Sequence, residues 1–128
     1  MKERSRQDLR SRTKAFALRV IKLYTSLPKT PEAQVLGKAA TPLRDIGGAH
    51  YHEACRSRSS AEFVSKIEGG LQELEETIYW LELIGEANIF DEDRLRPLHQ
   101  EAEELIAMFV TMVKKVKQNS RAGARGVV

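Results

Sequence analysis

The side chains best suited to chemistry in this sequence are its histidines and its one cysteine. His50, His52 and Glu53 lie close together, and His99 precedes Glu103 by one helical turn. Metal sites in helical bundles use His and carboxylate ligands on facing helices, and the di-iron pattern needs a Glu three residues before a His. No Glu of this chain precedes a His by three residues. We therefore predict no metal and no cofactor, and a metal- or small-molecule-binding bundle is the third-ranked hypothesis.

Nucleophilic and phosphate-transfer chemistry also lack their motifs. Cys55 has no plausible triad partner, and a small thiol of this kind is more often a packing residue. Gly47 and Gly48 are not followed by the Lys-Ser/Thr pair of a phosphate-binding loop, and there is no Gly-x-Ser-x-Gly. The sequence predicts that the protein is not an enzyme. A single cysteine cannot form an intrachain disulfide, which favours a reducing, cytoplasmic location.

The basic residues are the remaining functional candidates, and they gather at the two ends of the chain. Residues 1–29 hold nine Lys/Arg and two acids, residues 62–104 hold thirteen acids and three bases, and residues 105–128 hold five bases and no acid. Basic segments favour a polyanion partner, because Lys and Arg contact phosphates without reading sequence. The predicted nucleic-acid contacts are Arg10, Arg12, Lys14, Arg19, Lys22, Arg56, Arg58, Lys114, Lys115 and Lys117.

Two functions remain open for these charges. If the first and last helices lie side by side, their basic residues merge into one patch that binds RNA or DNA. Alternatively, the bases pair with the acidic helix of the same or a neighbouring chain, and the protein is an interaction scaffold without nucleic-acid binding. Binding that weakens steeply with salt would favour the first function.

The apolar spacing predicts four helices that position these residues. Apolar residues of the first helix recur at helical spacing from Leu9 to Leu27, and Pro28 ends it. A second helix over residues 31–56 contains Pro42 and is expected to kink there. Thr30 and Pro31 are a good N-cap and first-turn pair for its start.

The third and fourth helices have the clearest signals. Ser59 and Glu62 fit a capping box, and an amphipathic helix of about 27 residues follows and ends near Gly85. Asp91 or Asp93 is expected to cap the last helix. Its apolar seam alternates three- and four-residue steps: Leu95, Leu98, Ala102, Leu105, Phe109, Met112 and Val116. The predicted architecture is an all-α, antiparallel up-down four-helix bundle over residues 1–118, with a basic flexible tail over residues 119–128.

Several large apolar residues are surplus to one buried seam per helix. Trp80 falls off the stripe that holds Ile78 and Leu81, and the first helix has similar extra residues. Since Trp is enriched at subunit contacts, we predict an oligomer interface. Its residues are Trp80, Tyr24, Leu18 and Ile21.

Length and composition agree with one helical domain outside the membrane. The chain has 128 residues, of which 6% are aromatic and 41% hydrophobic. No apolar run approaches the roughly 20 residues of a bilayer span, and no apolar segment follows the charged N-terminus. We therefore expect neither a membrane span nor a secretory signal.

Two segments of the sequence resemble a known family. Residues 47–59 read Gly-Gly-Ala-His-Tyr-His-Glu-Ala-Cys-Arg-Ser-Arg-Ser before Ser-Ala-Glu-Phe, and residues 71–83 read Leu-Gln-Glu-Leu-Glu-Glu-Thr-Ile-Tyr-Trp-Leu-Glu-Leu. Over roughly residues 10–118, the chain resembles the four-helix-bundle proteins encoded by intervening sequences within 23S ribosomal RNA genes, relatives of which include accessory proteins of diversity-generating retroelements. The resemblance implies a homo-oligomer, typically a pentameric barrel, with a basic surface suited to nucleic acid. Arg56 and Arg58 match the family's Arg-x-Arg.

One segment departs from the family pattern. Residues 39–46 read Ala-Ala-Thr-Pro-Leu-Arg-Asp-Ile, where family members usually read like Gln-Leu-Leu-Arg-Ser-Ala-Thr-Ser. Codons for the observed residues, read one nucleotide later, can spell the family version. We therefore hypothesise paired compensating frameshifts in the gene or its sequencing, which would account for Pro42 inside a helix. The hypothesis fails if codons 39–46 of the gene cannot encode the alternative frame.

Overall fold

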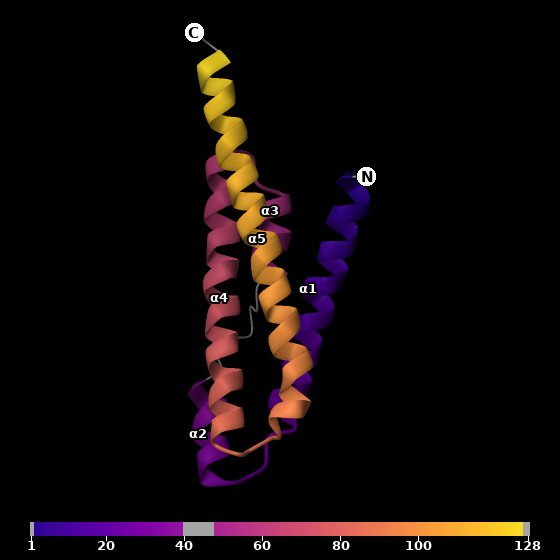
Figure 1. Cartoon of the computed structure of the whole chain (residues 1–128), viewed down its shortest axis with the longest axis vertical. Coiled ribbons are helices and arrows are strands. Elements are labelled where there is room, and N and C mark those ends of the chain that lie inside the picture. Colours follow the sequence, from indigo (N-terminus) through magenta and orange to yellow (C-terminus); the bar gives the residue numbers. More distant parts are fainter. Residues whose placement is uncertain (1, 40–47, 127–128) are drawn as a thin grey trace.

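The residues that the structure describes form five helices. The computed structural model describes residues 2–39 and 48–126, and side chains for residues 8–38 and 49–121. The helices are α1 (Lys2–Thr25), α2 (Pro31–Ala39), α3 (Gly48–Cys55), α4 (Ser60–Glu86) and α5 (Glu92–Gly126), shown in Figure 1. The predicted all-α class is confirmed, and the arrangement is consistent with a bundle.

The predicted second helix is two short helices. α2 begins at Pro31, where the Thr30 hydroxyl accepts a hydrogen bond of 3.3 Å from the Ala33 N–H, as expected for an N-cap. α3 begins at Gly48. Pro42 and residues 40–46 of the frameshift hypothesis lie outside the described residues, so that hypothesis stays a prediction.

The predicted capping box opens α4. The Ser59 hydroxyl accepts from the Glu62 N–H at 3.1 Å. The Glu62 carboxylate reaches back to accept from the Arg58 N–H at 3.3 Å, one residue before the usual partner. Local sequence therefore fixes where α4 starts.

α4 has the predicted length of 27 residues and ends at Glu86, next to Gly85 as predicted. Asn88, with a φ of 57°, takes the left-handed position that follows the helix end. Its N–H donates to the Gly85 carbonyl, and the Ile89 N–H donates to the Ile84 carbonyl, which is the Schellman pattern. Gly85 lies buried inside the helix, where an added Cβ would come within 3.3 Å of Leu95 Cδ1. The absence of a side chain at Gly85 lets α4 and α5 pack closely at this point.

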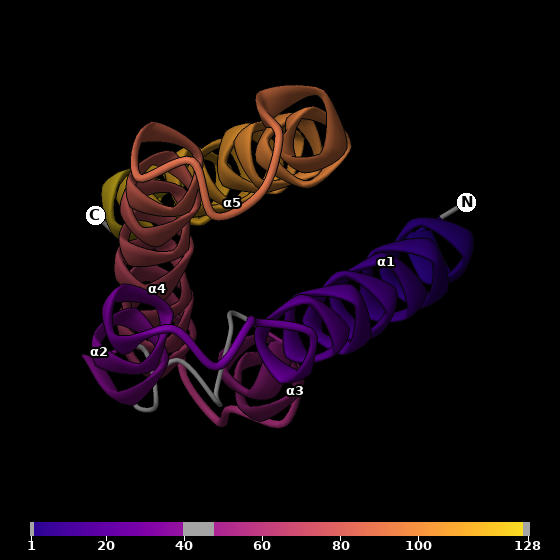
Figure 2. The same cartoon turned by 90° about the horizontal axis from the view of Figure 1, so that it is seen from below.

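α4 and α5 form the hairpin on which the other helices pack. α1 contacts α3 and α5, while α4 contacts α2, α3 and α5, so that α1 and α4 occupy opposite corners of the molecule (Figure 2). The core seams of α1, α4 and α5 are largely as predicted. The buried positions include Phe16, Val20, Ile67, Leu74, Leu81, Leu98, Ala102, Leu105 and Phe109.

Two details of the seams depart from prediction. Thr13 fills the seven-residue gap after Leu9, and its hydroxyl donates to the Arg10 carbonyl at 3.0 Å. Beyond Phe109, Val113 is buried and Met112 only half-buried, because a straight helix drifts away from a seven-residue repeat.

α5 also continues to Gly126, over most of the segment for which the sequence predicts a flexible tail. In the described residues, no helix is long and apolar enough to cross a membrane.

Candidate nucleic-acid interface

Arg12, one of the predicted nucleic-acid contacts, is a link between α1 and α5. Its Nε lies 3.2 Å from Glu101 Oε2 and its Nη2 lies 2.5 Å from Glu101 Oε1, with Glu104 Oε2 at 3.7 Å. The side chains of Arg12 and Glu101 are only 26% and 17% exposed. The hydrogen bonds with Glu101 raise the pKa of Arg12. The charge of Arg12 is therefore paired with Glu101 between α1 and α5. The sequence does not show this ion pair, because the two residues are 89 positions apart.

The other predicted bases of α1 are exposed. They are Arg10, Lys14, Arg19 and Lys22. Lys14 and Lys22 lie one turn before and one turn after Leu18, and Ile21 lies beside them. Leu18 is 58% exposed and Ile21 is 47% exposed. On α1, therefore, positive charge surrounds an exposed apolar centre.

The basic end of α5 has a different setting. We use this name for Lys114, Lys115, Lys117 and Arg121, all of which are exposed. Figure 1 shows the last turns of α5 projecting past the start of α4 and beyond every other helix. Within the described residues, the only acid paired with this end is Glu68, which accepts from Lys117 Nζ at 3.4 Å.

Arg56 and Arg58 are exposed in the turn between α3 and α4. This turn lies toward the same end of the molecule as the projecting part of α5 (Figure 1). The N-terminus of α1 lies toward that end as well, but it diverges from the C-terminus in both views (Figures 1 and 2). α1 and α5 thus meet where Arg12 contacts Glu101, while their terminal turns lie apart.

The remaining predicted interface residues pack on the core of their own chain. Trp80 and Tyr24 are both half-buried against it. Burial raises the pKa of Tyr24 to about 12, and its buried hydroxyl has no hydrogen-bond partner among the described residues. The neighbour of Trp80 is the exposed one, since Tyr79 is 56% exposed and touches Trp80 edge-on at 5.4 Å between ring centroids. Successive residues of a helix differ by about 100° in direction, so the sequence prediction selected Trp80 where its neighbour Tyr79 is the exposed residue.

His50 has a structural partner on the neighbouring helix. His50 Nε2 lies 2.8 Å from Glu73 Oε1, which ties α3 to α4, and its ring fits against the backbone at Gly69. A Cβ at Gly69 would lie 3.1 Å from the His50 ring. Glu53 pairs with Lys66 at 2.8 Å, and this hydrogen bond lowers the pKa of Glu53. Among the described residues, no group of three or more His, Cys, Asp or Glu side chains could hold a metal ion.

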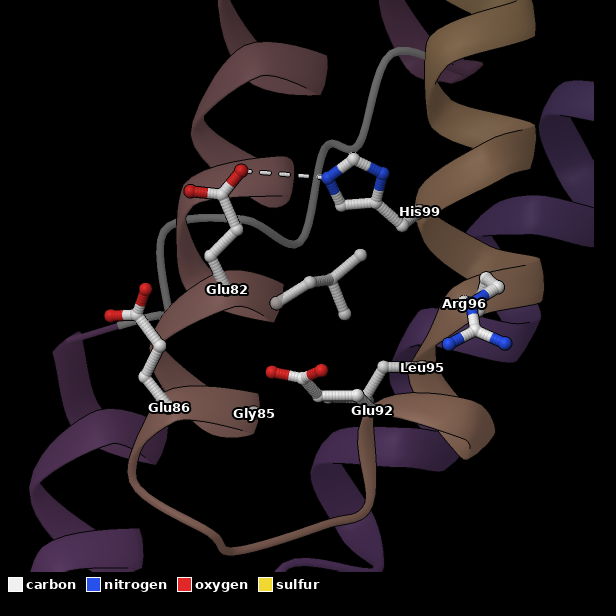
Figure 3. A pocket seen from close by; sticks show the side chains of 8 residues that line it. Glu82, Gly85, Glu86, Glu92, Leu95, Arg96 and His99 are labelled. Atoms are coloured by element: carbon white, nitrogen blue, oxygen red, sulfur yellow. Dashed lines mark hydrogen bonds and ion pairs between the residues drawn. The ribbon is translucent and has the colours of Figure 1, made fainter.

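The hairpin end of the molecule is acidic. A pocket of about 250 Å³ lies between α4 and α5, with Gly85 and Leu95 in its wall. Figure 3 shows the carboxylates of Glu82, Glu86 and Glu92 around it, with one dashed contact of 3.5 Å from Glu82 to His99. Arg96 and His99 line the same pocket, so its carboxylates are partly balanced by basic side chains.

Comparison with known proteins relates the chain to one family. The family described as "23S rRNA-intervening sequence protein" matches residues 6–111. The chain is also similar to a crystal structure of a protein with unknown function from the S23 ribosomal protein family of Bacteroides thetaiotaomicron. The identity is 25%, the TM-score is 0.77, and the match covers 85% of this chain and 97% of that one. No curated protein matches the chain.

Proposed function

The chain belongs to the 23S rRNA-intervening sequence protein family, and we propose that it is a non-enzymatic, self-associating protein that binds RNA through the basic end of α5. The observation that carries this proposal is the run of exposed bases at the end of α5, Lys114, Lys115, Lys117 and Arg121, in a segment (residues 105–128) that has five bases and no acid. An RNA strand can approach such a helix from several sides without meeting a carboxylate of the same segment.

Phosphate contact is the chemistry that this surface supports. The ammonium groups of Lys114 and Lys115 stand free in solvent, and neither has an ion-pair partner in the described part of the chain. Each contact with a phosphate releases counterions, which gives affinity that falls with salt and does not depend on sequence. Arg56 and Arg58 can add bidentate phosphate contacts from the α3–α4 turn.

The test is the binding of a short labelled single-stranded RNA, measured by fluorescence anisotropy over a salt series. For the unaltered protein, we expect the logarithm of affinity to fall linearly with the logarithm of salt concentration, with a slope of about 0.7 per phosphate contacted. The double variant Lys114→Glu/Lys115→Glu should bind far more weakly and with a shallower slope.

The matched control carries the same change of charge on α1. Lys14→Glu/Lys22→Glu should leave the affinity for the short RNA within a small factor of the unaltered protein. Equal losses in the two variants would show that only net charge matters, and no binding at low salt would overturn the proposal.

An interaction scaffold without nucleic-acid binding is the second candidate. It is favoured by the exposed apolar side chains Leu18, Ile21 and Tyr79, and by the use of Arg12 within the fold. A protein that assembles but is indifferent to RNA at every salt concentration would establish this alternative.

A further inference from the structure

An apolar pocket of about 450 Å³ lies where α1, α3 and α5 meet. Leu9 of α1 and Tyr51 of α3 are the buried residues of its wall, and Met108 and Met112 of α5 are half-buried in it. Pockets that take small molecules have volumes of roughly 300–1,000 Å³ and a mostly apolar lining with a few polar groups. This pocket therefore has the size and the lining of a small-molecule site.

The buried part of the pocket wall is fixed by the core, while its methionines can adapt. The ring of Tyr51 is 2% exposed and stacks on Phe109, with 6.0 Å between the ring centroids. Met108 Sδ accepts a hydrogen bond of 3.6 Å from Arg12 Nη1. Because methionine side chains are flexible and polarizable, Met108 and Met112 can close around apolar bodies of different shape.

The exposed polar groups at the rim of the pocket are hydrogen-bond acceptors. Asp8 is exposed and is the only charged residue in the described wall. The Thr111 hydroxyl donates to the Ala107 carbonyl at 2.9 Å, so it offers a ligand its oxygen lone pairs. The rim thus suits a ligand whose polar end carries hydrogen-bond donors.

The charge of Asp8 is not neutralised by Arg12, which lies one turn further along α1. The Arg12 guanidinium pairs with Glu101 and lies 3.7 Å from Glu104. Its pKa is raised by the hydrogen bonds with Glu101 and by the negative charges of Glu101, Glu104 and Asp8. Three carboxylates around one guanidinium leave a surplus of negative charge beside the pocket, which attracts a cation.

We propose that this pocket binds a small hydrophobic primary amine. The apolar body of the amine packs against Leu9, Met108 and Met112, and its ammonium group stays at the rim, where Asp8 and Thr111 accept its hydrogen bonds. An ammonium group has three donors and no acceptor, which matches this rim. The apolar contacts supply most of the affinity, and Asp8 selects against alcohols and carboxylic acids of the same size. The proposed site does not depend on RNA binding.

The test compares ligands that share one apolar body, namely phenylbutylamine, phenylbutanol and phenylbutanoate. Each is titrated without RNA into the unaltered protein, and the methyl NMR signals of Met108 and Met112 are followed. The amine should shift both signals to saturation, the alcohol should bind about fivefold more weakly, and the acid more weakly still. Unshifted signals at millimolar amine, equal affinity of amine and alcohol, or tightest binding of the acid would overturn the proposal.

Two variants locate the ligand. Asp8→Asn should remove the preference for the amine over the alcohol, whereas Glu76→Gln, which removes an exposed carboxylate of α4, should keep it. Ala107→Phe places a ring in the pocket wall and should abolish binding of all three ligands. Circular dichroism should show unchanged helicity, because all three positions are exposed. Amine affinity equal to that of the unaltered protein in Asp8→Asn or in Ala107→Phe would place the amine elsewhere and overturn the site.

Discussion

Two basic surfaces of this protein look alike in sequence and differ in structure. On α1, Lys14 and Lys22 surround the exposed Leu18 and Ile21, and Arg12 is turned inward to Glu101. On α5, Lys114, Lys115, Lys117 and Arg121 are exposed, and no exposed large hydrophobic side chain lies among them in the described residues. Apolar surface within a charged rim suits a protein partner, whereas bases alone suit phosphates. The surroundings of the lysines, more than their number, therefore indicate what each surface binds.

The largest effect should come from reversing charge on α5. We expect Lys114→Glu/Lys115→Glu to weaken RNA binding by about tenfold or more at low salt, since a hydrogen bond to a charged group contributes about 1.5–3 kcal/mol. Anisotropy titration measures this. A loss of less than twofold would mean that the RNA, if bound at all, contacts another surface.

Arg12 should affect stability and leave the RNA contacts of α5 intact. Arg12→Ala leaves Glu101 largely buried without its partner, which we expect to cost about 1–3 kcal/mol of unfolding free energy. Chemical denaturation measures the loss. Arg19→Ala, an exposed control on the same helix, should change stability by less than about 0.5 kcal/mol. Equal losses of unfolding free energy in the two variants would mean that Arg12 contributes no more to stability than an exposed base.

Tyr24 should make the stability of the folded protein fall at alkaline pH. Its pKa is about 12 in the folded protein and near 10 when unfolded, so the folded state holds the proton more tightly and stability falls as the pH rises from 10 towards 12. Tyr24→Phe should reduce this loss and leave stability at neutral pH equal or slightly higher, because the buried hydroxyl has no described partner. Thermal unfolding at pH 7 and 10.5 measures both effects, and the exposed Tyr79→Phe is the control. An unchanged alkaline loss in Tyr24→Phe would assign it to other groups.

The smallest effect should come from Lys117. Its contact with Glu68 is long and exposed, at 3.4 Å with both side chains 53% exposed. Lys117→Ala should cost about 0–1 kcal/mol of stability while reducing the salt slope of RNA binding by roughly one phosphate. A larger loss of stability would mean that the contact of Lys117 with Glu68 stabilises the fold, as the contact of Arg12 with Glu101 does.

What the sequence predicts well in this protein is local. Ser59 and Glu62 act within one turn, so the start of α4 could be read from four residues, and the α5 seam follows from its spacing. What it misses depends on partners distant in sequence or on a helix's rotation. Arg12 pairs across 89 positions, and Tyr79 takes the outward place expected of Trp80. The basic residues could be found from sequence, but their division into two surfaces needed the packing of α1, α4 and α5.

The most direct test of this division is one series of light-scattering runs with and without the short RNA, on the α1 and α5 double variants. We predict that Lys114→Glu/Lys115→Glu assembles like the unaltered protein but gains no RNA mass. We predict that Lys14→Glu/Lys22→Glu is monomeric and still binds RNA, in a complex that dissociates at high salt. Loss of assembly and RNA binding together in either variant would contradict the account, because one surface would then serve both purposes.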